Sequence, residues 1–94
     1  MADIDVTHNT ARQRFETEVE GHLAYADYRL DDGVMVFTST QVPGAVGGRG
    51  IAGRLVRTAM DYAREHGHGV EPACSYVSAW LERHPEYRDL RAGR

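Results

Sequence analysis

Val42-Pro43-Gly44-Ala45-Val46-Gly47-Gly48-Arg49-Gly50-Ile51-Ala52-Gly53 is the stretch of sequence that decides the fold. A run typical of a β-strand, Val34 to Val42, precedes the glycines, and an amphipathic helical pattern, Ile51 to Ala63, follows them. A glycine-rich turn between a strand and a helix leaves backbone N–H groups free for an anion, and the positive end of the helix dipole adds to the attraction. Glycines without a Cβ would also let a pyrophosphate approach the main chain closely. The alternative interpretation is a flexible connection that happens to be rich in glycine.

Two standard phosphate-binding loops are excluded by this stretch. A Walker A loop needs Gly-Lys-Ser/Thr at its end, and here Ile51 follows Gly50. The string Gly48-Arg49-Gly50-Ile51-Ala52-Gly53 does match a dinucleotide fingerprint, which belongs in a parallel βαβ unit. Because the preceding segments have the pattern of an antiparallel meander and only about forty residues follow, a Rossmann domain does not fit.

Length and composition predict one small globular domain, residues 1–94. Apolar residues make up 41% and charged residues 27%, which argues against disorder. The net charge of −3 lacks the electrostatic signature of a nucleic-acid-binding protein. No apolar run is long enough to span a membrane, and the acidic start has no signal-peptide h-region, so we expect a cytoplasmic protein. The single cysteine, Cys74, excludes an intramolecular disulfide.

Hydrophobic periodicity predicts a mainly antiparallel sheet backed by two helices. Alternation and β-branched residues indicate three strands, at Arg14 to Val19, His22 to Leu30 and Val34 to Thr40. Asp32-Gly33 is typical of a hairpin turn, whereas residues 1–11 are polar and we expect them to be weakly held. After the glycine loop, the pattern predicts a helix ended by Gly67, a short strand within His68 to Ala73, and a second helix with Ser75 as its N-cap and Pro85 at its end. This order predicts a two-layer α+β fold.

With this order in place, the chain resembles a known superfamily. The segments Thr40-Gln41-Val42-Pro43, Gly48-Arg49-Gly50-Ile51-Ala52 and Leu55-Val56 resemble motif A of the GNAT acetyltransferases. Cys74-Ser75-Tyr76 and Arg83-His84-Pro85-Glu86-Tyr87 resemble a branch of very short GNAT-like proteins. The resemblance implies a truncated GNAT-like fold, acetyl-CoA or coenzyme A as co-substrate, and an amine or other small molecule as the acyl acceptor. By the same resemblance, we expect the chain to lack the first helices, which build the acceptor site in full-length GNAT enzymes.

The resemblance also implies a set of coenzyme-binding residues. Val42 corresponds to the strand residue whose backbone pairs with the pantetheine arm, and the glycine loop corresponds to the pyrophosphate cradle. The residues implied are Val42, Gly47, Gly48, Arg49, Gly50, Ile51 and Ala52. Two positions depart from the family pattern: Gly47 stands where a basic residue is usual, and Gln41 stands where this branch often has Glu.

Cys74 and Tyr76 are the candidate catalytic residues. Cys74 precedes a predicted helix start, which stabilises a thiolate, and the resemblance places it near the thioester, so one interpretation is a covalent acyl-cysteine route. The alternative is a small buried residue. Tyr76 corresponds to the tyrosine that protonates the departing thiolate in larger GNAT enzymes, and the alternative is an aromatic packing residue.

The remaining polar residues give weaker signals. Arg54 and Arg57 are within reach of the 3′-phosphate or adenine end of the coenzyme, or else form a solvated helix face. His66 and His68 have no third ligand nearby in the sequence, so no metal site is predicted.

Three functions are compatible with the sequence. The first is a small acetyltransferase that binds acetyl-CoA and transfers its acyl group. The second is a non-catalytic acyl-CoA-binding or sensing module, which Gln41 in place of an acid favours. The third is an interaction domain in which the glycine loop is only a connection.

Overall fold

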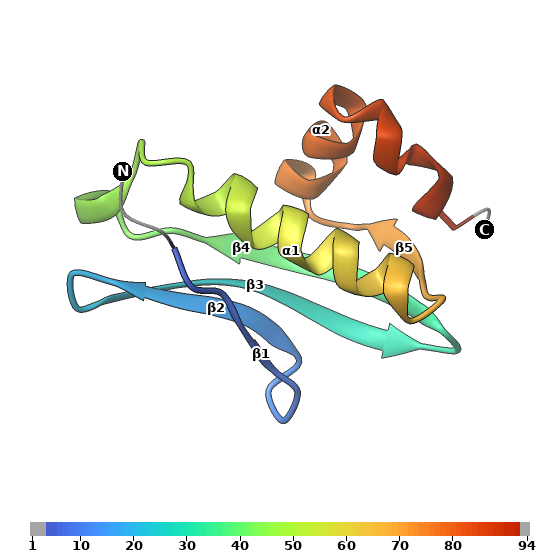
Figure 1. The fold of residues 1–94 in the computed structure, drawn as a ribbon, viewed down its shortest axis with the longest axis horizontal. Helices are drawn as coiled ribbons and strands as arrows, with labels where there is room; N and C mark the ends of the chain where they lie inside the picture. The colour runs from blue at the N-terminus through green and yellow to red at the C-terminus, as the bar shows by residue number, and fades with distance from the viewer. Residues whose placement is uncertain (1–3, 93–94) are drawn as a thin grey trace.

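The computed structural model describes residues 4–92, and in this part of the chain a five-stranded sheet is packed against helices (Figure 1). The strands are β1 (Thr7–Asn9), β2 (Arg14–Val19), β3 (His22–Asp31), β4 (Val34–Gln41) and β5 (Gly69–Pro72). The helices are α1 (Ile51–Glu65) and α2 (Ser75–Arg83), with 3-10 helices η1 (Gly44–Val46) and η2 (Pro85–Leu90). The strands follow one another across the sheet in chain order, and only the β4–β5 pair is parallel. The predicted α+β fold is confirmed.

Two tight turns set the register of the antiparallel strands. Glu20-Gly21 joins β2 to β3, and Asp32-Gly33 joins β3 to β4. All four residues have positive φ, between 51° and 80°, as a two-residue turn that matches the twist of a hairpin requires. The predicted hairpin at Asp32-Gly33 therefore forms, and its two turn residues adopt the positive φ angles for which Asp-Gly is suited.

Strand β1 corrects the expectation of weakly held chain at residues 1–11, of which residues 1–3 lie outside the described part. Thr7–Asn9 pair antiparallel with β2. The side chain of His8 stacks on Phe15 with ring centroids 4.2 Å apart, and its Nε2 lies 2.5 Å from the Tyr28 hydroxyl. The polar residues of β1 give no strand pattern in the sequence. The strand is stabilised by contacts with aromatic rings far along the chain, and not by the β-propensity of its own residues.

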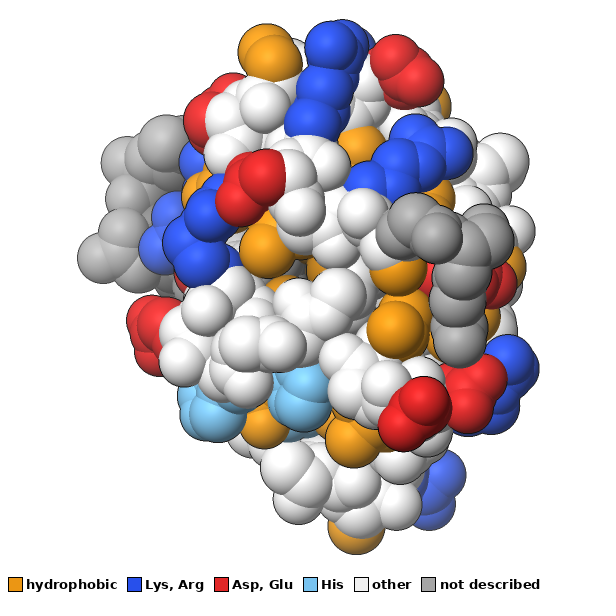
Figure 2. Space-filling view, turned by 90° about the vertical axis from the view of Figure 1, so that its right-hand side faces the viewer, with side chains coloured by type: hydrophobic (Ala, Val, Ile, Leu, Met, Phe, Trp, Pro, Cys, Tyr) orange, Lys and Arg blue, Asp and Glu red, His pale blue; other side chains and the backbone are white. Residues whose placement is uncertain are grey.

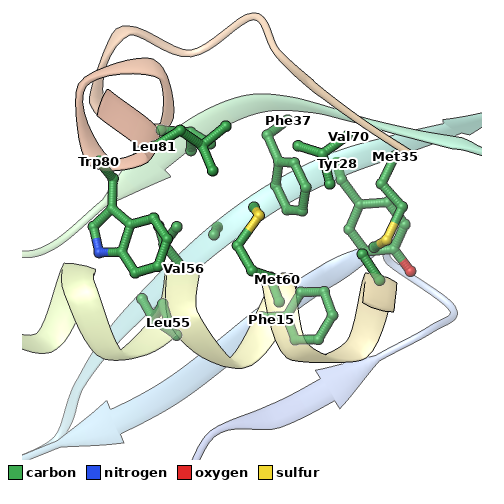
Figure 3. Close-up of a cluster of buried hydrophobic side chains, with 14 of the residues drawn as sticks. Phe15, Tyr28, Met35, Phe37, Leu55, Val56, Met60, Val70, Trp80 and Leu81 are labelled. Atoms are coloured by element: carbon green, nitrogen blue, oxygen red, sulfur yellow. The ribbon is translucent and has the colours of Figure 1, made fainter. Parts of the chain in front are cut away.

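Helix α1 covers one face of the sheet and forms the centre of the core (Figures 1 and 3). Its buried residues, Ile51, Leu55, Val56, Ala59, Met60 and Ala63, are those that the helical pattern predicts. Figure 3 shows Leu55, Val56 and Met60 of α1 packed between Phe15 of the sheet and Trp80 of α2. The helix ends at Glu65, and Gly67 follows with φ +69°, the left-handed conformation of a helix stop.

Helix α2 starts one residue earlier than the sequence predicts. Cys74, with extended φ and ψ, is the N-cap, and Ser75 is the first helical residue. Helix α2 ends at Arg83, two residues before Pro85. Pro85 is also the first residue of η2, so it begins this 3-10 helix as well as marking the end of α2. No helix in residues 4–92 is long and apolar enough to cross a membrane.

Candidate functional site

The glycine loop is a short, well-anchored connection between β4 and α1. Val46 of η1 is fully buried and fixes the loop to the core. Gly48 and Gly50 have φ of +78° and +73°, which side-chain-bearing residues adopt only under strain, whereas Gly47 has an ordinary φ of −65°. A Cβ added at Gly48 or Gly50 would meet no atom within 4 Å, so the protein leaves the space beside both residues open.

The start of α1 carries backbone donors that nothing in the described chain satisfies. Gly50 is the N-cap and has no side chain to accept a hydrogen bond, and the first turn contains no acidic residue. Among residues 4–92, the N–H groups from Gly48 to Gly53 donate to no protein acceptor, and the first intrahelical bond is Arg54 N–H to Gly50 O. Donors of this kind at the positive end of a helix dipole are suited to an anion.

Arg49 projects from the loop and is held by an acidic residue of the opposite hairpin. Its guanidinium lies 2.6 Å from the carboxylate of Glu20, in the β2–β3 turn. Both side chains are exposed. The hydrogen bond to Glu20 and its negative charge raise the pKa of Arg49, and the hydrogen bond from Arg49 and its positive charge lower the pKa of Glu20. In this structure the one cationic side chain of the glycine loop therefore has a carboxylate as its partner.

β4 and β5 separate close to the loop. The parallel ladder runs only from Val34 to Phe37 of β4, and its last link is the Cys74 N–H, which donates to Phe37 O at 2.8 Å. β4 continues to Gln41 beside β3, whereas β5 ends at Pro72, which has no N–H. The edge of β4 from Thr38 onward is thus open toward α2. Val42 follows directly, half-buried against the core.

A bulge in the β3–β4 ladder determines which groups face this opening. Asp27 pairs with Ser39 and Tyr28 with Phe37, so Thr38 is left without a partner on β3. The extra residue reverses the direction of the backbone groups that follow it. As a result, both the hydroxyl and the N–H of Thr40 lie near the Cys74 sulfur, with Oγ1 to Sγ at 3.6 Å.

Cys74 is half-buried at the head of α2, beside this opening. Burial raises the pKa of its thiol, but the N–H groups of Val77, Tyr76 and Thr40 and the Thr40 hydroxyl lower the pKa, and the net shift is downward. The thiolate is therefore favoured by donors that the fold already has in place.

Tyr76 lies on the other side of the head of α2. Its hydroxyl is 3.7 Å from where a Cβ on Gly53 would be, against the first turn of α1. Trp80 Nε1 approaches Gly53 to the same distance, so a glycine here gives both aromatic side chains room to pack on α1. The structure thus places Tyr76 under the start of α1, and its role as general acid stays a prediction.

A cavity of about 520 Å³ lies between α1 and α2 and brings several of these residues together. From the loop and α1 it is lined by Arg49, Gly50, Gly53, Arg54 and Arg57. From α2 and the residue after it the lining includes Tyr76, Trp80, Arg83 and His84, and Ile4 completes it. Of the predicted site residues, Arg49, Gly50 and Tyr76 line this cavity. Among the described residues, Val42 and Cys74 lie instead at the strand opening, and Gly47, Gly48, Ile51 and Ala52 belong to the loop and the start of α1 without lining the cavity.

Several residues at these two places are not assigned a role by the sequence analysis. Glu20 and Thr40 are brought in by the turn and the bulge, and the sequence carries no signal for either contact. Trp80, Arg83 and His84 are spaced to share one face of a helix with the predicted residue Tyr76, and this spacing is a signal that the sequence does offer. The side chain of His84 bonds back to the Trp80 carbonyl at 2.8 Å and stacks on the Trp80 ring.

Two comparisons relate this fold and site to known proteins. A family model described as GCN5-related N-acetyl-transferase matches residues 14–90. The solution structure of a GCN5-like protein from Staphylococcus aureus superposes with a TM-score of 0.76, at 24% sequence identity, over 100% of this chain and 93% of that chain. At this identity the structural likeness supports the fold, and the family model covers the loop, the strand opening and α2.

Proposed function

The chain belongs to the GCN5-related N-acetyl-transferase family, and from this premise we propose that it binds acetyl-CoA and transfers the acetyl group to an amine or another small acceptor. The observation that carries the proposal is the unsatisfied start of α1 beside the opening between β4 and β5. An anion bound at the loop can continue as an extended chain along the open edge of β4, which has peptide groups to pair with it.

The cradle would act mainly through backbone groups. The N–H groups from Gly48 to Ala52 are the donors for a pyrophosphate, and the open space beside Gly48 and Gly50 lets its oxygens come close. Ile51 is buried, so its contribution would come from its N–H and not from its side chain. Val42 and the end of β4 would hold the pantetheine arm by backbone pairing.

Chemistry would take place where Thr40 and Cys74 meet. A carbonyl oxygen near the Thr40 N–H would be stabilised as charge develops on it during attack. In the direct route, the nitrogen of a neutral acceptor amine attacks the thioester carbon, the carbon–sulfur bond breaks, coenzyme A leaves as its thiolate, and the nitrogen gives up a proton to solvent. Tyr76 is our candidate for the group that returns a proton to that thiolate.

A covalent route would use Cys74 as an intermediate acceptor. Its thiolate would attack the thioester carbon, coenzyme A would leave as its thiolate, and the acetyl group would stay on Sγ until an amine removes it. The lowered pKa of Cys74 and the donors around its sulfur support this route. The two routes predict different consequences of removing the thiol.

Mass spectrometry of the purified protein tests the proposal. We expect coenzyme A to copurify, and incubation with acetyl-CoA to add one acetyl group to the wild-type protein but not to Cys74→Ala. Release of free coenzyme A thiol, followed with a panel of amines, then reports turnover. Turnover that survives in Cys74→Ala identifies the direct route, and a protein that binds no coenzyme A would disprove the proposal.

Gln41 favours a second candidate, an acyl-CoA-binding module without turnover. The side chain lies at the exposed end of β4 with its amide 3.5 Å from the Ser39 hydroxyl, and an amide cannot accept a proton as a carboxylate does. Tight binding of acetyl-CoA with neither an adduct nor amine-dependent release would identify this function. Gln41→Glu should then confer measurable turnover if only the base is missing.

A further inference from the structure

The first described residues of the chain reach two separate hollows along α1. Ile4 lines the cavity between α1 and α2, whereas Val6 and His8 line a second hollow of about 280 Å³ further along the helix. An extended chain from Ile4 to His8 spans about 13 Å. Helix α1 rises by a similar length, about 12 Å, from Gly53 in the first lining to Asp61 in the second. One short segment is therefore long enough to contact both hollows.

Side chains, and not backbone pairing, hold the start of this segment. Pairing with β2 begins at Thr7, and in the described chain residues 4–6 belong to no strand. Ile4 and Val6 are half-buried against the core, whereas Asp5 between them is exposed. Because the edge strand that follows has only three residues, the whole segment is of the kind that opens locally at a low free energy.

His8 anchors the segment through contacts with three different elements. Its ring stacks on Phe15 of β2 at 4.2 Å and meets Tyr62 of α1 edge-on at 4.4 Å, both measured between ring centroids. Its Nε2 lies 2.5 Å from the hydroxyl of Tyr28 on β3. The docked position of β1 therefore depends on one imidazole ring that is packed among aromatic rings.

The surroundings of this ring favour its neutral form. The titratable groups that face it from β3 and α1 are Tyr28, Asp61, Tyr62, Glu65 and His66. On β2, the charged residues on either side of Phe15 lie on the other face of the sheet, because side chains alternate along a strand. Asp61 and Glu65 are exposed to solvent, whereas burial and the charge of His66 hold the pKa of His8 below its ordinary value. Histidine side chains also lie next to one another at the end of the molecule that carries the β3–β4 turn (Figure 2), so protons taken up there add like charges.

We propose that residues 4–9 form a strap that closes the cavity over bound coenzyme, and that protonation of His8 releases this strap. The inference rests on the proposed function, because coenzyme bound at the glycine loop would occupy the cavity that Ile4 completes. With His8 neutral, β1 stays docked and Ile4 shields the cavity from water. With His8 charged, β1 leaves the edge of the sheet, Ile4 leaves with it, and the coenzyme dissociates faster.

The rate of coenzyme A dissociation tests the strap above pH 6.5. Trp80 is the single tryptophan and lines the cavity, so its fluorescence reports dissociation on rapid dilution. Ile4→Ser should speed dissociation about three- to tenfold, because an aliphatic contact is lost. Val6→Ser should speed it as well, although Val6 lines the other hollow, because the strap docks as one piece. Leu30→Ser, at an exposed residue of β3, is the control.

The same measurement on either side of pH 6.5 tests the role of His8. In the wild-type protein, dissociation should accelerate as the pH falls, and in His8→Gln the acceleration should be smaller. The phosphates of the coenzyme titrate in the same range for every protein, so the comparison is between variants. His68→Gln removes a ring 6.2 Å from that of Tyr62 and should behave as the wild type, since the ring contacts of His8 are with Phe15, Tyr28 and Tyr62.

Amide hydrogen exchange separates the strap from the proposed function. Coenzyme A should slow the exchange of residues 5–9 relative to that of residues 31–34 at the β3–β4 turn. If coenzyme A binds and this ratio does not change, or if Ile4→Ser alone speeds dissociation, the strap is overturned and coenzyme binding stands. If His8→Gln accelerates as much as the wild type on acidification, His8 is not the switch. If coenzyme A does not bind at all, the proposed function and the strap fail together.

Discussion

At the scale of single residues, the meeting of Thr40 and Cys74 is the most informative contact in the molecule. The two residues are far apart in the sequence, and the bulge at Thr38 turns both the N–H and the hydroxyl of Thr40 toward the Cys74 sulfur. The glycines and the cysteine are visible in the sequence, but the direction of a backbone N–H after a bulge is not. The reactivity of Cys74 therefore depends on a group that only the structure reveals.

Replacing Thr40 by valine should raise the pKa of the Cys74 thiol, because the variant loses a hydroxyl that favours the thiolate. The rate of alkylation by iodoacetamide, measured against pH, gives this pKa. The wild-type curve should rise at a lower pH than that of a free cysteine, and the Thr40→Val curve should be displaced upward. Ser39→Ala, a neighbouring hydroxyl on β4, is the control. Identical curves for all three proteins would show that Thr40 does not influence the thiol.

Glu20 is the second residue whose effect follows from a long-range contact. Its carboxylate holds Arg49 at 2.6 Å and places a negative charge beside the loop that should bind a pyrophosphate. Glu20→Gln should therefore tighten coenzyme A binding about two- to fivefold at low salt, the scale expected for an exposed ion pair. Glu18→Gln, the same charge change on β2, separates the local contact from the overall charge. An equal gain in both variants would argue against competition at Arg49.

At the scale of elements, hydrophobic periodicity and turn residues predict the helices, strands and hairpins whose formation depends on local sequence. Helix α1, the hairpin at Asp32-Gly33 and the strands β2 to β4 follow from periodicity and turn residues, and the structure has all of them. Strand β1 and the N-cap at Cys74 do not follow. The first depends on aromatic contacts of His8 with residues that lie far along the chain, and the second on the bond from the Cys74 N–H to Phe37 O, which fixes the chain before the helix begins.

The docking of β1 should depend on pH through His8. Burial, and the charge of His66, hold the pKa of His8 below its ordinary value of 6.5. Well above pH 6.5 the ring is neutral in both the folded and the unfolded chain. As pH falls, the unfolded chain takes up the proton first, so the free energy of unfolding decreases until the pH has passed the lower pKa of the folded state.

Urea denaturation on either side of pH 6.5 measures this effect. The wild-type protein should lose more stability on acidification than His8→Gln, which has no titrating ring at this position. His22→Gln, an exposed histidine on β3, is the control and should behave as the wild type. If His8→Gln loses as much stability as the wild-type protein, His8 is not the group responsible.

At the scale of the whole molecule, the two helices and the sheet create the site between them. Neither the cavity nor the strand opening belongs to one element: α1 and α2 enclose the first, and β4, β5 and the head of α2 form the second. Sequence patterns identify individual candidate residues, such as Cys74 and Tyr76. They do not show which of these residues lie together at the cavity and which at the strand opening, because that depends on how α2 packs after β5. The core that fixes this packing, which includes Val56 of α1 and Trp80 and Leu81 of α2, is continuous from the sheet to α2 (Figure 3).

Because the ligand would contact all these elements, its binding should stabilise the whole fold. At a hundred times its dissociation constant, acetyl-CoA should add about 2.7 kcal/mol to the free energy of unfolding. For a chain of this size that corresponds to a rise in Tm of about 10 °C or more. A thermal melt with and without acetyl-CoA measures the shift, and its absence would contradict binding at any physiologically useful affinity.

A pair of glycine variants shows whether the shift arises at the loop. Gly50→Ala places a methyl group in the open space where phosphate oxygens would lie, and Gly67→Ala places one at the opposite end of α1. Both glycines have positive φ, +73° and +69°, so the two variants should lose similar stability from backbone strain alone. The gain in Tm on adding acetyl-CoA should then be small for Gly50→Ala and fully retained for Gly67→Ala. Equal gains in the two variants would mean that the coenzyme binds away from the start of α1, because only there does a Cβ at residue 50 stand in its way.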